Sequence, residues 1–157
     1  MKLYHGSDVE VRVPEIRPSQ FTKDFGAGFY CTKLKRQARR WAARKDPSII
    51  SEYEYTASHD LYIKEFTAMT DEWLNFIVSC RLGHPHEYDI VIGPMANDQV
   101  YNYVEDYANG TITRTQFWAL AEFKYPTHQV CFATDRALSS LTFLTSKNIE
   151  SHARKRA

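Results

Sequence analysis

The sequence of 157 residues lacks the features that mark several large classes of protein. It has no run of about 18 apolar residues, so we expect no segment to span a bilayer. Its opening stretch, MKLYHGSDVEV, contains no apolar h-region, so we expect no secretory signal. No GxGxxG motif opens a helix after a strand, which argues against a Rossmann dinucleotide site. Repeats, low-complexity tracts and linkers are also missing, so a single domain is expected at this length.

Cysteine is scarce, with only Cys31, Cys80 and Cys131 and no CxxC spacing. An odd number of widely spaced cysteines favours free, buried thiols in a reducing compartment over a disulfide, so we expect a cytoplasmic protein. Cys80 lies near His84 and His86 in the sequence, but a fourth ligand is missing and the spacing fits no closed zinc site. We therefore expect no metal.

A net charge of one sign is nearly absent, since 20 Lys and Arg oppose 19 Asp and Glu, which gives +1. This balance provides no overall electrostatic reason to expect a nucleic acid or a membrane as partner. The charge is uneven, however, because residues 33–45 hold a run of basic side chains and 154–156 read Arg-Lys-Arg. Such a run is either a solvated helix face or a surface that binds a phosphate backbone, and both interpretations stay open. The basic residues of the first run are Lys33, Lys35, Arg36, Arg39, Arg40, Arg44 and Lys45.

The chain is rich in apolar and aromatic residues, at 43% and 14%, which is an ordinary globular composition that favours sheets. The expected strands are Lys2–Gly6, Gly28–Thr32, Ile50–Ala57, Leu61–Phe66, Asp89–Pro94 and His128–Thr134. The expected helices are Lys33–Lys45, a segment from Thr70 to near Gly83, Asp98–Ala108 and Thr113–Phe123, and residues 8–27 are expected to form an irregular loop. Strands gathered at both ends with helices between them favour an α+β domain over a doubly wound one.

Two of these helices carry clear local signals. From Leu34 to Ala42 the apolar residues recur with helical spacing, and Pro47 disfavours helix at the residue before it. Thr113 and Gln116 form the pattern of a capping box, in which each side chain satisfies a backbone N–H of the other residue. The first of these helices is therefore expected to end before Pro47, and the second to begin at Thr113.

Three short segments carry residues suited to a binding site. LYHGS, at 3–7, places an imidazole at a strand end beside a glycine, where a ligand can approach the backbone closely. DFGAGFYCT, at 24–32, places Phe29 and Tyr30 on opposite faces of a strand, so one ring is available to stack on a ligand. HQVCFATDRAL, at 128–138, places Gln129 on a strand face where a lone carboxamide marks either an edge or a site. Each segment taken alone fits a purely structural role at least as well.

The order of the three segments resembles the His-Tyr-acid signature of the ADP-ribosyltransferase superfamily, in the branch of diphtheria toxin and the poly(ADP-ribose) polymerases. More closely, the chain resembles a bacterial domain family of unknown function within that superfamily, whose pattern is LYHGS, DFGxGFYxT, QAxxWA, EYDIVIGP and HQxxFxT. The chain has these motifs at 3–7, 24–32, 37–42, 87–94 and 128–134. The resemblance implies an ADP-ribosyltransferase-like domain over residues 1–145, followed by a basic C-terminal tail over 146–157.

The resemblance also implies a fold and a site. The implied fold is α+β, with two packed antiparallel sheets that form an NAD cleft and helices on the flanks. His5, Tyr30 and Gln129 are the implied catalytic residues, with NAD as co-substrate. His5 would bind the ribose on the adenosine side, backbone groups of Gly6 the nicotinamide amide, and Tyr30 the nicotinamide ring, with Phe29 behind it in the core. The full set of implied NAD-binding residues is His5, Gly6, Ser7, Gly28, Phe29, Tyr30 and Thr32.

Gln129 stands where this superfamily usually has Glu. A carboxamide offers its oxygen to the ribose 2′-hydroxyl, but it carries no full charge and is no general base at neutral pH. Such a residue suits an acceptor that is already nucleophilic or one that another side chain activates. Asp98 and His128 are candidates for that second role, and a helix N-cap is the alternative for Asp98.

The implied function is NAD-dependent mono-ADP-ribosyl transfer to a nucleic acid or protein, as by a bacterial toxin or effector, for which an antitoxin protein is a candidate partner. Two other functions stay open. One is a catalytically silent module that binds NAD or ADP-ribose and acts through a partner, and the other is an NAD glycohydrolase. Nicotinamide release in the presence of candidate acceptors distinguishes them, because the silent module would release none.

Overall fold

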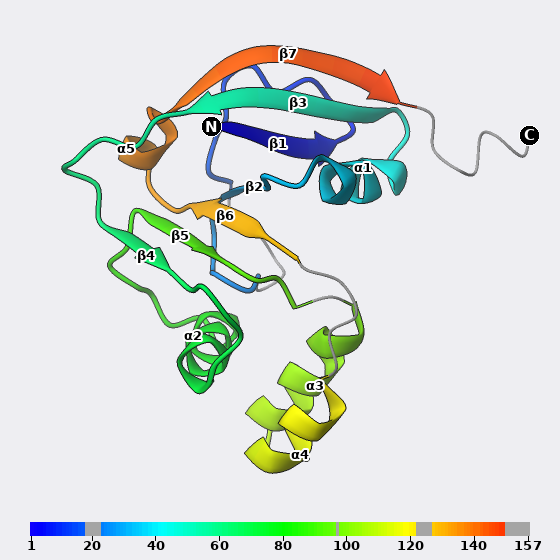
Figure 1. Ribbon diagram of the computed structural model, residues 1–157, viewed down its shortest axis with the longest axis vertical. Helices are drawn as coiled ribbons and strands as arrows, with labels where there is room; N and C mark the ends of the chain where they lie inside the picture. Colours follow the sequence, from blue (N-terminus) through cyan, green and yellow to red (C-terminus); the bar gives the residue numbers. More distant parts are fainter. Residues whose placement is uncertain (18–22, 97, 122–126, 150–157) are drawn as a thin grey trace, which may run out of the picture.

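The computed structural model describes residues 1–17, 23–96, 98–121 and 127–149 of the chain (Figure 1). Within this part, strands form two sheets and helices flank them. Antiparallel pairing predominates, with β4–β5 as the parallel pair. The mixed α+β class expected from the order of the elements is therefore confirmed.

The three-stranded sheet has the order β1-β3-β7 and the four-stranded sheet the order β2-β6-β5-β4. The strands are β1 (Lys2–Ser7), β2 (Phe29–Cys31), β3 (Ser48–Tyr55), β4 (Ile63–Glu65), β5 (Ile90–Gly93), β6 (Gln129–Phe132) and β7 (Leu141–Ile149). The helices are α1 (Lys35–Ala43), α2 (Asp71–Arg81), α3 (Asp98–Ala108), α4 (Arg114–Leu120) and α5 (Asp135–Leu138). Among the described residues, no helix combines the length and the apolar character needed to cross a membrane.

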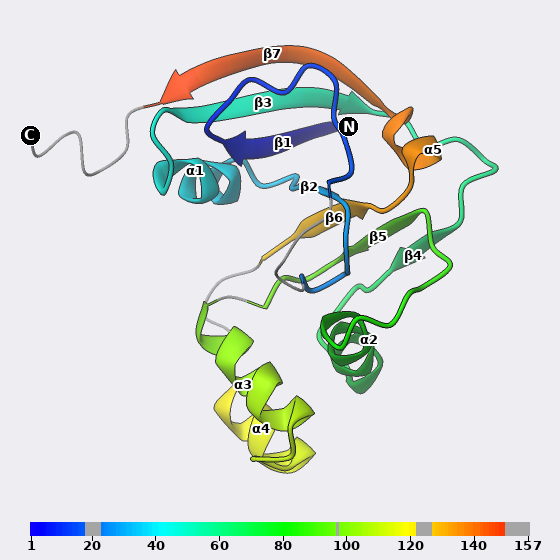
Figure 2. The same cartoon turned by 180° about the vertical axis from the view of Figure 1, so that it is seen from behind.

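Two apolar cores lie on the two faces of the four-stranded sheet. One core lies between the sheets and includes Leu3, Phe29 and Phe132. The other lies under α2, α3 and α4, which Figure 2 shows on the side away from the three-stranded sheet. Successive residues of a strand point to opposite faces, so Phe132 enters the first core and Cys131 the second. This alternation also places Gln129 on the Cys131 side, as the sequence predicts.

Helix α1 packs closely against the end of β1, because Gly6 has no side chain. A Cβ atom at Gly6 would lie 2.2 Å from the carbonyl oxygen of Ala38, so a larger residue would displace the helix. Gln37 fixes the other side of α1, since its carboxamide donates to the His128 carbonyl at 2.5 Å and accepts from the His128 N–H at 3.1 Å. The helix is thus held to β1 and to the start of β6.

The local helix signals are confirmed. Thr113 and Gln116 form the complete capping box at the start of α4, and the Thr70 hydroxyl accepts from the Trp73 N–H at the start of α2. Helix α3 has the expected bounds, whereas α1 and α4 are shorter at both ends than expected. The last residues of the expected helix at 113–123 lie outside the described part of the chain.

Strand β7 and the short helix α5 do not correspond to any element expected from the sequence. The pairing of β7 with β3 shifts register between Glu52 and Tyr53, where Leu144 is the additional residue on β7. Such a bulge breaks the two-residue alternation that identifies a strand in a sequence. Strand β7 also contains the expected boundary between a domain at 1–145 and a tail at 146–157. Residues from 150 onward lie outside the described part of the chain.

Candidate functional site

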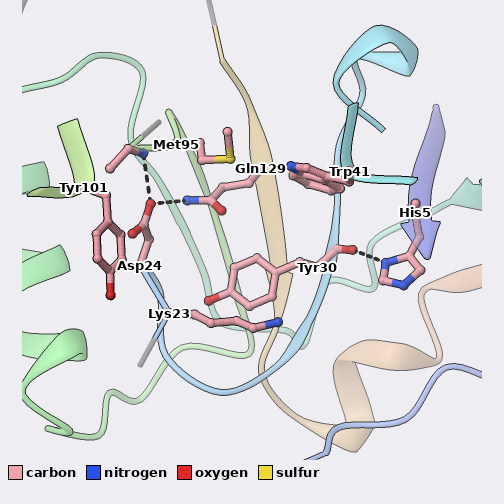
Figure 3. A pocket seen from close by; sticks show the side chains of 10 residues that line it. His5, Lys23, Asp24, Tyr30, Trp41, Met95, Tyr101 and Gln129 are labelled. Carbon is pink, nitrogen blue, oxygen red and sulfur yellow. Dashed lines mark hydrogen bonds between the residues drawn. The ribbon is translucent and has the colours of Figure 1, made fainter. Parts of the chain in front are cut away.

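A cavity of about 350 Å³ lies where β1, β2 and β6 meet α1 and the segment after β5 (Figure 3). It brings together His5, Tyr30 and Gln129, which come from three separate strands. The remaining lining residues are Gly6, Lys23, Asp24, Trp41, Met95, Ala96 and Tyr101. The three residues that the sequence nominated as catalytic thus share one cavity.

The orientation of the Gln129 carboxamide follows from its partner. Gln129 is buried, and its Nε2 atom donates to Asp24 Oδ2 at 3.2 Å. A carboxylate only accepts hydrogen bonds, so the amide nitrogen must face Asp24. The carbonyl oxygen Oε1 is then turned away from Asp24, toward the space above Tyr30 (Figure 3). Asp24 therefore makes Gln129 a hydrogen-bond acceptor toward the cavity.

Asp24 is in turn held by a buried ion pair with Arg81. Both side chains are less than one tenth exposed, and the guanidinium donates to Oδ1 through Nη2 and also through Nε, the latter at 3.1 Å. Asp24 Oδ2 also accepts from the Ala96 N–H at 2.9 Å. The guanidinium lies over the ring of Tyr101, 3.9 Å from its centroid. This network fixes the carboxylate on both oxygens.

Tyr30 presents its ring, and not its hydroxyl, to the cavity. The hydroxyl donates to the Gly26 carbonyl at 2.6 Å and accepts from the Phe25 N–H at 3.1 Å. Burial is the main reason that the pKa of Tyr30 lies above its ordinary value, so the phenol stays protonated. The Lys23 ammonium lies 4.9 Å from the ring centroid, a cation–π contact from an exposed side chain that a planar ligand can displace.

His5 offers one ring nitrogen to a ligand. Its Nδ1 lies 2.6 Å from the Tyr30 carbonyl oxygen, and a carbonyl only accepts, so Nδ1 carries the proton. Burial lowers the pKa of His5, the bond to Tyr30 partly opposes this, and the charge of Lys23 adds to the lowering. The neutral ring therefore leaves Nε2 as an acceptor, for example for a ribose hydroxyl. The ring also stacks on Phe29, with 4.3 Å between centroids.

A second cavity, of about 330 Å³, adjoins the first, and His5 and Lys23 line both. Ser7, Gly28 and Phe29 line this second cavity. Of the seven residues implied to bind NAD, all but Thr32 therefore line one or both of these two cavities. Phe29 also lies in the core between the sheets, as the sequence suggests.

Thr32 is not among the residues that line either cavity. It is fully buried, its backbone pairs with Tyr4, and its hydroxyl accepts from the Leu34 N–H at 3.0 Å. Its place in the structure is thus the turn that leads into α1. Cys31 lies in the core between the sheets, and burial raises the pKa of its thiol, which makes it a poor nucleophile.

Two residues considered as activating bases are placed differently. His128 is buried, is absent from the lining of the first cavity, and accepts the Lys33 N–H at Nδ1, at 3.2 Å. Asp98 begins α3, but its side chain lies outside the described part of the chain. Among the described residues, no group of His, Cys, Asp and Glu side chains is arranged to hold a metal ion.

His128 is expected to make the fold sensitive to acid. Burial, reinforced by the charge of Lys33, lowers its pKa to about 4 from 6.5. The unfolded chain then binds more protons than the folded chain below pH 6.5, so stability is complete above this pH and is lost as pH falls toward 4. His128→Asn keeps an acceptor for the Lys33 N–H but does not titrate. Between pH 6.5 and 4, it should lose on the order of 1–2 kcal/mol less stability than the native chain, allowing for solvent screening.

Urea denaturation at intervals from pH 7 to pH 4 measures this difference. Parallel stability profiles for the native chain and His128→Asn would show that another group dominates the acid sensitivity.

Several residues that line the first cavity were not predicted from the sequence as site residues, among them Lys23, Asp24, Trp41 and Tyr101. Asp24 opens the DFGAGFYCT segment, so an acid within a candidate motif was the available signal. Its partner Arg81 lies 57 residues away, so no local pattern could connect them.

Comparison with known families identifies a family whose description gives no function. The family model described as "Protein of unknown function (DUF3990)" matches residues 1–143, which is most of the chain. No match was found among curated proteins or among solved structures.

Proposed function

Because the chain belongs to the DUF3990 family, whose description assigns no activity, its function must be inferred from its site, and we propose that it is an NAD⁺-dependent mono-ADP-ribosyltransferase. One observation supports this above the others: His5, Tyr30 and Gln129 lie around one cavity, although they come from segments far apart in the sequence. A cavity lined by β1 of one sheet and by β2 and β6 of the other also suits the ADP-ribosyltransferase fold that the motifs imply.

The proposed reaction breaks the bond between nicotinamide and its ribose. Nicotinamide leaves with the bonding electron pair, a nucleophile of the acceptor attacks C1′ of the ribosyl cation, and the nucleophile loses its proton. Gln129 Oε1 would accept the ribose 2′-hydroxyl and direct a negative dipole at the cation. Asp24 supports this role because its charge polarises the amide and prevents it from turning. The face of Tyr30 would hold the nicotinamide ring, and His5 Nε2 the ribose on the adenosine side.

The uncharged Gln129 also favours a second candidate, a silent module that binds NAD⁺ or ADP-ribose and acts through a partner. The third, an NAD⁺ glycohydrolase, would release nicotinamide and free ADP-ribose without labelling a macromolecule. Incubation with NAD⁺ labelled on adenine, followed by protease or nuclease, separates the three. The transferase attaches label to an acceptor, the hydrolase releases only free ADP-ribose, and the module releases no nicotinamide.

Titration calorimetry with NAD⁺ tests the cavity itself. Tyr30→Ala should weaken NAD⁺ binding ~10-fold or more, because it removes a stacking surface. Tyr30→Phe should keep the affinity within about threefold, while losing about 1–3 kcal/mol of stability, because the Phe25 N–H and Gly26 carbonyl lose their partner.

The comparison of the two variants separates binding from folding. A folded native chain with no saturable NAD⁺ response would refute the proposal. A Tyr30→Phe variant that loses binding as severely as Tyr30→Ala would show that the hydroxyl, and not the ring face, is what the ligand needs.

A further inference from the structure

A third cavity, of about 300 Å³, lies beside α1, on the face of the three-stranded sheet that points away from the core between the sheets. It is lined from β1 by Lys2 and Tyr4, from β3 by Glu52, and from β7 by Lys147. In the sheet register Tyr4 pairs with Glu52, and Ile50 of the lining pairs with Lys147, so these strands present one continuous face. Lys35 and Arg39 of α1 complete the wall.

This space is strongly basic. Four of its lining side chains are cationic, and Glu52 is the acidic one, 3.9 Å from Lys2. Lys35, Arg39 and Lys147 are exposed, so their ammonium and guanidinium groups are accessible to a ligand. The overall charge of the chain is only +1, so this concentration is local. An anion is therefore the class of ligand that the space attracts.

The aromatic ring of Tyr4 indicates which kind of anion fits the cavity. Tyr4 is half-buried at the cavity, and the Lys35 ammonium lies 5.8 Å from its ring centroid. Cations that follow a backbone, combined with a ring on which a base can stack, are the usual elements of a single-stranded nucleic-acid site. An acidic peptide would use the cations but has no planar base for the ring.

Helix α1 separates this basic cavity from the candidate active site. Lys35 and Arg39 are four residues apart on one side of the helix, and Trp41 lies about 200° round the axis from Arg39. Trp41 lines the first cavity, together with His5 and Gly6, which follow Tyr4 on β1. A helix with its side chains is about 10 Å across, so a polymer bound at one cavity can extend round α1 to the other.

We propose that the basic cavity formed by Lys2, Lys35, Arg39 and Lys147 beside Tyr4 binds the phosphodiester backbone of a single-stranded nucleic acid. Its role is to dock the acceptor next to the cavity that holds NAD⁺. That role as acceptor rests on the proposed transferase function, whereas the binding itself does not.

Fluorescence anisotropy with labelled single-stranded DNA and RNA oligonucleotides tests the binding, with the full chain and a salt titration. The triple variant Lys35→Gln/Arg39→Gln/Lys147→Gln should bind ~10-fold or more weakly. The slope of log affinity against log salt should fall by about 2, since each lost phosphate contact removes about 0.7 for a single strand. The matched control Lys33→Gln/Arg36→Gln/Lys45→Gln removes the same charge from exposed positions outside the cavity and should keep most of the affinity.

Equal weakening by the two triple variants would overturn the proposal, because general charge would then explain the binding. Absence of binding to both oligonucleotides, or equal competition by poly-glutamate, would also overturn it. Preference for RNA or for DNA identifies the source of the phosphodiester, and either supports the site. Nicotinamide release measured separately keeps the two proposals distinct, since oligonucleotide binding without release would contradict the transferase and leave the docking site intact.

Discussion

Replacing Gln129 with alanine is expected to slow nicotinamide release about 100-fold, which is the usual effect of losing one preorganised polar group that acts on the transition state. The affinity for NAD⁺ should change less than about threefold, because the contact gains strength only as the ribosyl cation develops. Steady-state release measured across NAD⁺ concentrations, with candidate acceptor present, gives kcat and KM separately. A Gln129→Ala variant as active as the native chain would exclude Gln129 from the reaction.

Gln129→Glu is a less simple test than the superfamily pattern suggests. A carboxylate at 129 would face Asp24, whose Oδ2 now accepts from Gln129 Nε2 at 3.2 Å. Two buried like charges at this separation oppose each other, so the single variant is expected to be less stable and to hold a proton between the two acids. This gives a physical reason why the chain has an amide there.

The double exchange Asp24→Asn/Gln129→Glu restores one acid and one amide with their positions swapped. It removes the like-charge pair at the price of the Arg81 ion pair, and it is expected to raise water-driven NAD⁺ hydrolysis, since the full charge now lies at 129. Hydrolysis no faster than in Gln129→Ala would show that the position of the charge does not limit the reaction.

Replacing Asp24 with alanine is expected to cost about 3–5 kcal/mol of stability, because it leaves a buried charge on Arg81 without its partner. The Ala96 N–H and the Gln129 amide lose their acceptor as well. Chemical denaturation monitored by fluorescence measures the change in the free energy of unfolding.

The double variant Asp24→Ala/Arg81→Met is the matched control. Removal of the unpaired charge should return at least half of the lost stability, because a buried ion pair is often replaced by apolar groups at little cost. A double variant no more stable than Asp24→Ala would show that the hydrogen bonds of Asp24, and not its charge, hold the site together. An Asp24→Ala variant within about 1 kcal/mol of the native chain would remove Asp24 from the structural argument.

Much of the local structure follows from the sequence. The alternation of HQVCFAT predicts that Gln129 and Cys131 share a face opposite Val130 and Phe132, and the two cores divide them in that way. The capping residues Thr70 and Thr113 begin their helices as expected. These features depend on the alternation of side chains along a strand and on hydrogen bonds between residues two to four apart. Both can be predicted from a short window of sequence.

Elements that lack such a period were not predicted from the sequence. Strand β7 is mostly exposed and carries a bulge at Leu144, so its apolar residues do not alternate throughout. Its position is instead decided by pairing with β3, a partner about 90 residues earlier in the chain, and this pairing also provides Lys147 to the basic cavity. A sheet partner at that distance leaves no mark in a short window of sequence.

The sequence by itself determined the candidate residues: it placed His5, Tyr30 and Gln129 in three motifs. Alternation along the strands also indicated that Tyr30 lies opposite Phe29 and that Gln129 shares a face with Cys131. Only the tertiary structure decided that they line one cavity, and that Gln129 meets Asp24, 105 residues away, while Asp24 meets Arg81. The physical reason is that a buried charge must find its partners wherever packing brings them. Strand faces and helix caps are local properties, whereas the orientation of the Gln129 amide depends on contacts that exist only in the folded chain.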